Sequence, residues 1–187
     1  MRNFSARVVK ALSVVVLVSG CSNSPTVAPP FVLTLPEAPD SLRPPANQVL
    51  AVEAIGRGVQ IYECTATQGQ PGQFEWVFKA PDAELVDLLS RRIGKHYAGP
   101  TWESTDGSTV VGEVKARADG PNPSAIPWLL LTAKSSSGTG VFSQVKSIQR
   151  LQTVDGKAPS AACSRDYAGQ VARVPYRAAY YFYVLKP

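Results

Sequence analysis

From about position 48 onward, hydrophobic and polar residues alternate along short stretches of the chain, and Gly, Pro, Asn and Asp separate these stretches. A period of two is typical of strands that bury one face, and the Val, Ile, Thr and aromatic residues found here favour strands. We therefore expect an all-β fold, an antiparallel β-sandwich or a barrel-like domain, with at most one short helix. The extended segments are VQIYECTAT (59–67), QFEWVFKA (73–80), STVVGEVKARA (108–118), IPWLLLTAK (126–134), VFSQVKSIQRLQT (141–153) and YRAAYYFYVL (176–185).

One segment, residues 82–93, fits two structures. It has an early acid, Leu85, Leu88 and Leu89 at helical spacing, and two arginines near its end, which is typical of a short helix. Gly94 interrupts that pattern and the flanking residues are strand-like, which favours a hairpin instead. Both interpretations stay open at this point.

The N-terminal residues 1–20 have the organisation of a lipoprotein signal peptide. Three basic residues precede an apolar run that is too short to span a bilayer, and the small residues of VSG lead directly to Cys21. This order resembles the lipobox of bacterial lipoproteins, which implies cleavage before Cys21 and acylation of that cysteine. The membrane is then a partner through the lipid anchor, and Ser22 after the cysteine favours the outer membrane. We expect a protein of the bacterial cell envelope.

Residues 21–47 read as a tether, because seven of the sixteen prolines lie between Ser22 and Asn47. Proline-rich segments favour the extended polyproline II geometry. The apolar piece FVLTLP (31–36) is expected to dock on the domain, which we place at residues 48–187. Removal of residues 1–20 takes away three of 19 Lys and Arg against 14 Asp and Glu, so the mature chain is near +2 (16 − 14). No basic cluster remains that indicates nucleic acid as a partner.

Two cysteines remain after Cys21. In an oxidising compartment Cys64 and Cys163 are expected to form a disulfide that joins the second core strand to the loop before the last strand, with two separate thiols as the alternative. No CxxC motif is present. We expect no cofactor and no metal, since zinc needs three or four nitrogen or sulfur ligands.

The segment GRGVQI (56–61) begins like a dinucleotide-binding fingerprint. It lacks the third glycine and precedes a strand rather than following one. We therefore interpret the segment as a turn and expect no nucleotide partner.

The stretch from His96 to Val114 carries the only histidine of the chain. Asp106-Gly107 predicts a tight hairpin turn, and the simplest interpretation gives the stretch a structural role only. A sharper hypothesis predicts a site for a carbohydrate or another envelope component, with aromatic platforms beside hydrogen-bonding groups. An envelope hydrolase that uses His96, or Glu103 with Asp106, is the alternative, although no catalytic residue is assigned. The candidate ligand-binding residues are His96, Tyr97, Trp102, Glu103, Asp106 and Trp128.

Several segments together resemble one protein family. They are GVQIYEC, KHYAGPTWESTDGS, AIPWLLL, VKSIQRLQT with DGKAP and Cys163, and VPYRAAYYFY. The chain is similar over most of residues 48–184 to a family of secreted bacterial and fungal proteins that is described as a domain of unknown function. The resemblance implies a mainly β fold and export. Some relatives carry a malate dehydrogenase label, which the failed dinucleotide fingerprint argues against. At LLSRRIG (88–94) relatives tend to have a turn, which favours the hairpin.

Overall fold

The computed structural model describes residues 36–187. The predicted signal peptide, Cys21 and most of FVLTLP lie outside the described residues. The described part contains eight strands and two short 3-10 helices, η1 and η2, and no helix in it has the length and apolar character needed to span a bilayer. The elements are η1 (Asp40–Leu42), β1 (Gln48–Ala66), β2 (Phe74–Val86), β3 (Arg92–Tyr97), β4 (Thr101–Ser104), β5 (Thr109–Ala118), β6 (Trp128–Ser137), β7 (Ser147–Asp155), η2 (Arg165–Tyr167) and β8 (Val171–Leu185).

The eight strands form one closed antiparallel barrel in which every strand pairs with its neighbours in sequence. β1 and β8 pair along most of their length and close the ring, so the barrel has no free edge there. The expectation of an all-β, barrel-like fold is confirmed. Phe142, fully buried and stacked on Phe182 at a ring-centroid distance of 4.5 Å, fills the end of the barrel near the β6–β7 connection.

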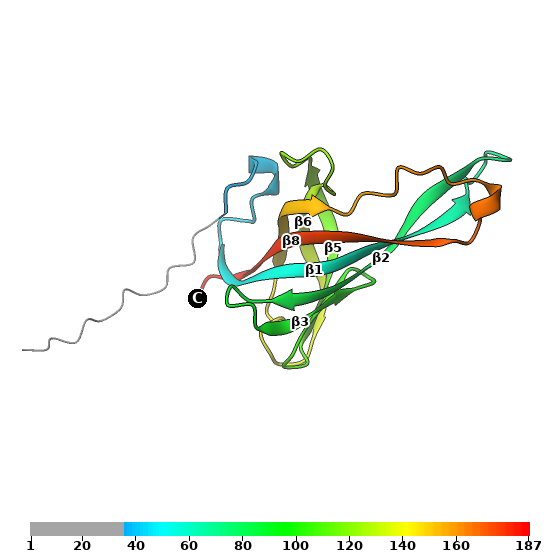
Figure 1. Cartoon of the computed structure of the whole chain (residues 1–187). Helices are drawn as coiled ribbons and strands as arrows, with labels where there is room; N and C mark the ends of the chain where they lie inside the picture. Colours follow the sequence, from blue (N-terminus) through cyan, green and yellow to red (C-terminus); the bar gives the residue numbers. More distant parts are fainter. Residues whose placement is uncertain (1–35) are drawn as a thin grey trace, which may run out of the picture. The chain divides into compact units, whose positions relative to one another are not determined.

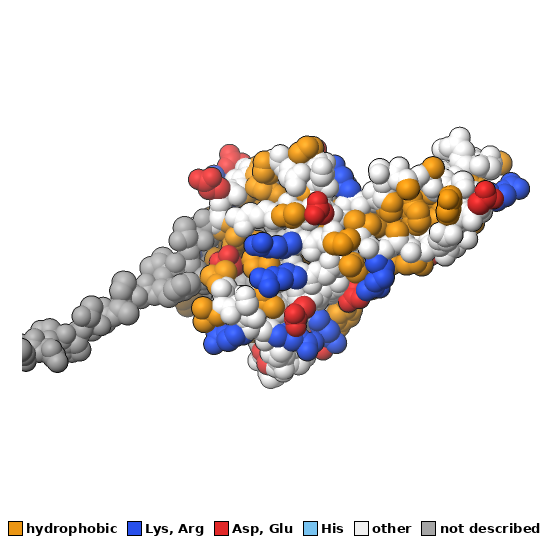
Figure 2. Space-filling view, viewed as in Figure 1, with side chains coloured by type: hydrophobic (Ala, Val, Ile, Leu, Met, Phe, Trp, Pro, Cys, Tyr) orange, Lys and Arg blue, Asp and Glu red, His pale blue; other side chains and the backbone are white. Residues whose placement is uncertain are grey.

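Three strands continue beyond the barrel. The first part of β2 and the start of β8 pair only with β1, because β3 pairs with β2 from Ala83 onward and β7 pairs with β8 from Tyr176 onward. Figure 1 shows β1, β2 and β8 leaving the barrel together, with η2 at the tip. Figure 2 shows hydrophobic side chains on the surface of this extension. Val77, Phe78 and Val171 are exposed hydrophobic residues of its strands.

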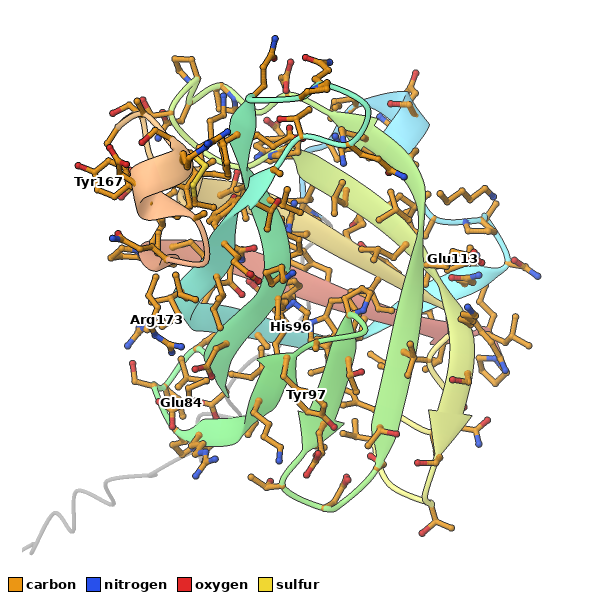
Figure 3. All side chains as sticks on the ribbon, turned by 90° about the vertical axis from the view of Figure 1, so that its right-hand side faces the viewer. Glu84, His96, Tyr97, Glu113, Tyr167 and Arg173 are labelled. Atoms are coloured by element: carbon orange, nitrogen blue, oxygen red, sulfur yellow. A yellow bond between two sulfur atoms is a disulfide. The ribbon has the colours of Figure 1, made fainter. Side chains whose placement is uncertain are left out.

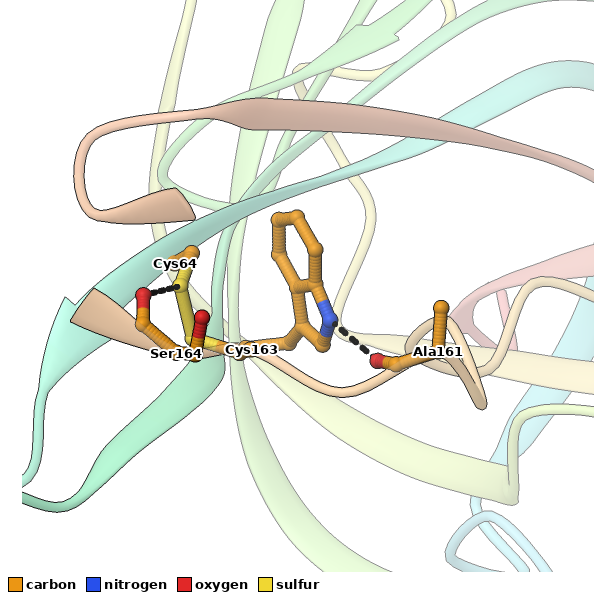
Figure 4. The surroundings of a disulfide bond; sticks show 5 residues. Cys64, Ala161, Cys163 and Ser164 are labelled. Carbon is orange, nitrogen blue, oxygen red and sulfur yellow. Dashed lines mark hydrogen bonds between the residues drawn. A yellow bond between two sulfur atoms is a disulfide. The ribbon is translucent and has the colours of Figure 1, made fainter. Parts of the chain in front are cut away.

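The disulfide between Cys64 and Cys163 is present, with Cα atoms 5.6 Å apart (Figure 4). It fastens the β7–β8 loop to the extension, and the indole of Trp76 donates a hydrogen bond to the carbonyl of Ala161 in the same loop. The prediction that Cys64 lies in the second core strand is wrong. Residues 48–66 form a single strand, so Cys64 belongs to the first.

The interpretation of GRGVQI as a turn is also wrong, because Gly56 and Gly58 lie inside β1. A Cβ on Gly58 would be 2.1 Å from the carbonyl oxygen of Asp82 in β2. Glycine inside a strand often marks a place where another backbone approaches closely. These glycines therefore allow parts of the neighbouring strands to approach β1 closely.

The segment 82–93 forms a hairpin. Leu85 and Val86 end β2 and are both buried, with Leu85 in the cluster inside the barrel, whereas Leu88 and Leu89 are exposed at the tip. The carboxylate of Asp87 accepts hydrogen bonds from the backbone N–H groups of Leu89 and Arg91, which fixes the turn. The predicted hairpin at Asp106-Gly107 joins β4 to β5, with Gly107 at φ +84°. Residues 141–144, predicted as part of an extended segment, form turns before β7.

Strand β8 is covered on both faces, as its aromatic pattern predicts. Tyr180 and Phe182 belong to the cluster inside the barrel, whereas Tyr181 and Tyr183 belong to a second cluster on the outer face of the barrel. Leu42 of η1 is fully buried in that outer cluster, and its carbonyl accepts a hydrogen bond from Gln149 at 2.6 Å. The last part of the segment predicted as a tether thus packs on the barrel.

Candidate functional site

A pocket of about 480 Å³ opens at the end of the barrel opposite Phe142. Side chains from all eight strands line it, together with the β3–β4 turn and the loop before β6. Its volume lies within the roughly 300–1,000 Å³ of small-molecule sites, and most of its lining is apolar, as is usual for such sites. An eight-stranded barrel is wide enough to hold one small ligand. The mouth of the barrel is therefore the candidate site.

His96 lies in this pocket wall and is 3% exposed. Its imidazole stacks on the indole of Trp102, the residue opposite it in β4, with ring centroids 4.3 Å apart. Nδ1 lies 2.9 Å from the carbonyl oxygen of Thr101, so Nδ1 carries the proton and donates it. Burial lowers the pKa of His96 to about 3, and the charge of Arg150 acts in the same direction. The imidazole is neutral at neutral pH, and its Nε2 is an acceptor.

Arg150 of β7 brings a guanidinium into the pocket. Its Nε and Nη2 donate to the carbonyl oxygen of Pro127, at 3.2 and 2.8 Å. Burial lowers the pKa of Arg150, an effect opposed by the hydroxyls of Tyr180 and Tyr176 beside it. Those two hydroxyls lie 3.2 Å apart. Within residues 36–187 no carboxylate pairs with Arg150, and residues 1–35 contain no Asp or Glu.

Two further donors in the pocket wall have no partner among the described residues. They are Nε2 of Gln60 and Nε1 of Trp102, on side chains that are 2% and 1% exposed. A buried donor without an acceptor costs roughly 1–3 kcal/mol, so such groups are rare in folded proteins. Both residues line the pocket, so these unpartnered donors lie in its wall or directly behind it.

The charges of the pocket have one sign. Lys79, Arg117 and Arg150 line it, and no acidic side chain does. Lys79 is neutralised by Glu63, 2.9 Å away, whereas Arg117 lies exposed at the rim and has no ion pair within the described part of the chain. The pocket is therefore electropositive.

The structure separates the residues that the sequence predicted as one site. His96 and Trp102 line the pocket, but Tyr97 and Glu103 point to the outer surface, as Figure 3 shows for Tyr97. There the Tyr97 hydroxyl donates to Glu103 at 2.8 Å, and Lys95 pairs with the same carboxylate. Because neighbouring residues of a strand face opposite sides, His96 and Tyr97 cannot share one face.

Asp106 and Trp128 also lie away from the pocket wall. Asp106 accepts hydrogen bonds from Ser108 and from the backbone N–H of Val141, which joins two loops and lowers the pKa of its carboxyl to about 2. Trp128 packs on the outer cluster that also contains Leu42. The contacts of Asp106 and Trp128 therefore stabilise the fold and do not shape the pocket.

This geometry does not assemble a hydrolytic site at His96. A histidine that acts as a base is normally oriented by a carboxylate, but the Nδ1 of His96 donates to a backbone carbonyl. Glu103 and Asp106 are engaged elsewhere. Within residues 36–187, no three His, Cys, Asp or Glu side chains are grouped as metal ligands. The pocket is suited to binding through apolar contact and directed donors.

Sequence reasoning missed Gln60, Arg150 and Tyr180. The one available signal is that Arg150 shares a strand face with Ile148, a core position. Since both faces of several strands carry apolar residues, the sequence does not identify the inward face.

These features define the class of protein as a disulfide-linked, eight-stranded antiparallel β-barrel with an electropositive pocket at one end. The chain belongs to the family described as "Protein of unknown function (DUF3455)", whose family model matches residues 44–184. No curated protein matches the chain, and no solved structure matches it.

Proposed function

We propose that this protein is a binding protein of the cell envelope that holds a small amphipathic molecule in the mouth of its barrel. The observation that carries the proposal is the pocket of about 480 Å³, in which the apolar wall contains buried donors that no described residue satisfies. Burial of a ligand's apolar surface would supply most of the affinity, and the donors would fix its orientation.

The ligand class predicted from the sequence, a carbohydrate or another envelope component, is narrowed by the geometry. A sugar site needs an open aromatic face, but one face of Trp102 is covered by His96 and Trp128 lies on the outer surface. The largely apolar lining favours an envelope component with an apolar body.

The test uses the full-length protein and the uncharged probe 1-naphthaleneacetamide, with titration calorimetry and tryptophan fluorescence as readouts. We expect saturable one-site binding that Val114→Trp abolishes, because Val114 is 47% exposed and lines the mouth. Val141→Trp is the matched control, since Val141 is 42% exposed and does not line this pocket. Binding that survives Val114→Trp, or is lost equally in both variants, contradicts the proposal.

The proposal also places the barrel on a membrane through acylated Cys21. The sequence of the leader supports this, and the Cys64–Cys163 disulfide is typical of exported proteins. Several acyl chains give stable anchoring, because each buried methylene contributes about 0.8 kcal/mol.

In a bacterial host, the wild-type chain should incorporate labelled palmitate and sediment with outer-membrane vesicles, and Cys21→Ser should lose both properties. Cys64→Ser is the control for nonspecific labelling. Palmitate incorporation that persists in Cys21→Ser contradicts the anchor.

A further inference from the structure

The guanidinium of Arg150 is the one charged group that lies deep in the pocket rather than at its rim. It lies beside His96 and Tyr180, which are 3% and 0% exposed. A cation in such an apolar environment is normally paired with an anion, because removal of its hydration is costly. Among residues 36–187, Arg150 has only the Pro127 carbonyl and neighbouring tyrosine hydroxyls as partners, and these do not use all the N–H groups of a guanidinium.

The groups around Arg150 also favour a ligand that brings hydrogen-bond acceptors and a negative charge. Gln60 and Trp102 contribute N–H groups for which the described part of the chain supplies no acceptor, and no acidic side chain lines the pocket. His96 adds no charge, because its proton is on Nδ1 and is donated to Thr101. The deep part of the pocket thus offers one full positive charge and an excess of donors, which matches a molecule that brings acceptors and one negative charge.

We infer that the ligand is a carboxylate monoanion on an apolar body, with its carboxylate at Arg150. This inference rests on the proposed ligand-binding function and specifies its ligand class. A planar carboxylate fits the planar fork of a guanidinium, and such charge-assisted bonds are about twice as strong as neutral ones. A phosphate monoester would bring close to two charges into a region that holds one deep cation, so the carboxylate is favoured.

Arg117 contributes from the rim. It is exposed, lines the mouth and is free of ion pairs within residues 36–187. Charges of one sign around an opening raise the rate at which an oppositely charged ligand enters. Arg117 thus attracts the anion, and Arg150 holds it.

The experiment compares two probes with the same apolar body, 1-naphthaleneacetate and the neutral 1-naphthaleneacetamide, by titration calorimetry on the full-length protein at pH 7.5. We expect the acid to bind at least about tenfold more tightly than the amide. Arg150→Met should abolish this preference while the amide still binds, and Arg150→Lys should retain part of it. Arg117→Met is the matched control, and should slow acid binding without removing the preference at equilibrium.

The outcomes separate the two proposals. Equal affinity for both probes, a preference that persists in Arg150→Met, or tighter binding of 1-naphthyl phosphate overturns the inference and leaves the binding function standing. Failure of both probes to bind overturns the proposed function and the inference with it. If Arg150→Met does not fold, a crystal structure of the wild-type complex decides, because the inference requires the carboxylate within hydrogen-bond distance of Arg150.

Discussion

The ring of Tyr180 lies directly over Gly56 of the neighbouring strand, so that a Cβ on Gly56 would be 2.6 Å from Cε2 of the ring. Tyr180 is fully buried and also lines the pocket beside Arg150. The glycine in β1 therefore sets the position of one wall of the candidate site. A small residue in the sequence is thereby connected to the shape of the pocket.

Gly56→Ala should destabilise the protein, because the added Cβ would clash with the buried Tyr180 ring, which would have to leave its packed position. We expect a loss of about 1–3 kcal/mol in the free energy of unfolding, measured by urea denaturation. Arg57→Ala, at the exposed position between the two glycines of β1, should change it by less than about 0.5 kcal/mol. Equal effects of the two substitutions would contradict the close approach of Tyr180.

The buried imidazole of His96 should make stability depend on pH. Its pKa is about 3 in the folded protein, mainly because of burial, against an ordinary value of 6.5 for the unfolded chain. Between these values the unfolded chain binds the proton and the folded protein does not, so stability should fall as the pH falls from 6.5 towards 3. His96→Gln should remove this slope in denaturation curves measured at successive pH values.

The carboxyl of Asp106 provides the control for that measurement. Its pKa is lowered from 3.8 to about 2, chiefly by the hydrogen bond from the Ser108 side chain. Its contribution is present above pH 3.8 and is lost as the pH falls towards 2, so Asp106→Asn should alter only this lower range. A wild-type stability that stays constant from pH 6.5 to 4 would show that His96 is not buried in the folded protein.

Loss of the disulfide should lower stability without changing the barrel. Cys64 and Cys163 are 99 residues apart, for which the chain-entropy model gives about 4.7 kcal/mol as an upper value. Cys64→Ala with Cys163→Ala should lower the free energy of unfolding by up to that amount and leave the far-ultraviolet dichroism unchanged. Reduction of the wild type should reproduce the effect, and reduction of the double variant should have none.

Leu42→Ala tests the contact between η1 and the outer face of the barrel. Leu42 is fully buried among Leu130, Leu151 and Tyr183, so we expect a loss of about 2–5 kcal/mol in the free energy of unfolding. Leu89→Ala, at a position that is 73% exposed, is the matched control and should have little effect. If the two variants are equally stable, η1 does not pack on the barrel in solution.

Local sequence signals predicted the parts of the fold that depend on neighbouring residues. The alternation in YRAAYYFYVL predicted a strand covered on both faces, and Asp106-Gly107 predicted the β4–β5 turn, because both depend on short-range geometry. Helical spacing of Leu85, Leu88 and Leu89 was ambiguous. The hairpin is decided by the burial of Leu85 in the barrel and by the hydrogen bonds of Asp87, and the first of these depends on distant strands.

The candidate site was predicted only in part, for a related reason. His96 and Trp102 line the pocket, but Tyr97, Glu103 and Asp106 were grouped with them only because they are close in sequence. Gln60, Arg150 and Tyr180 come from β1, β7 and β8, and meet because the barrel closes between β1 and β8.

The sequence by itself determined an all-β domain, its cysteine pair and most of its strands, since strand propensity, alternation and turn chemistry act over a few residues. Only the tertiary structure decided which face of each strand points inward, and therefore which polar groups are buried. The inward face is selected by the register of eight strands around a closed ring, which places the Arg150 guanidinium within an apolar pocket.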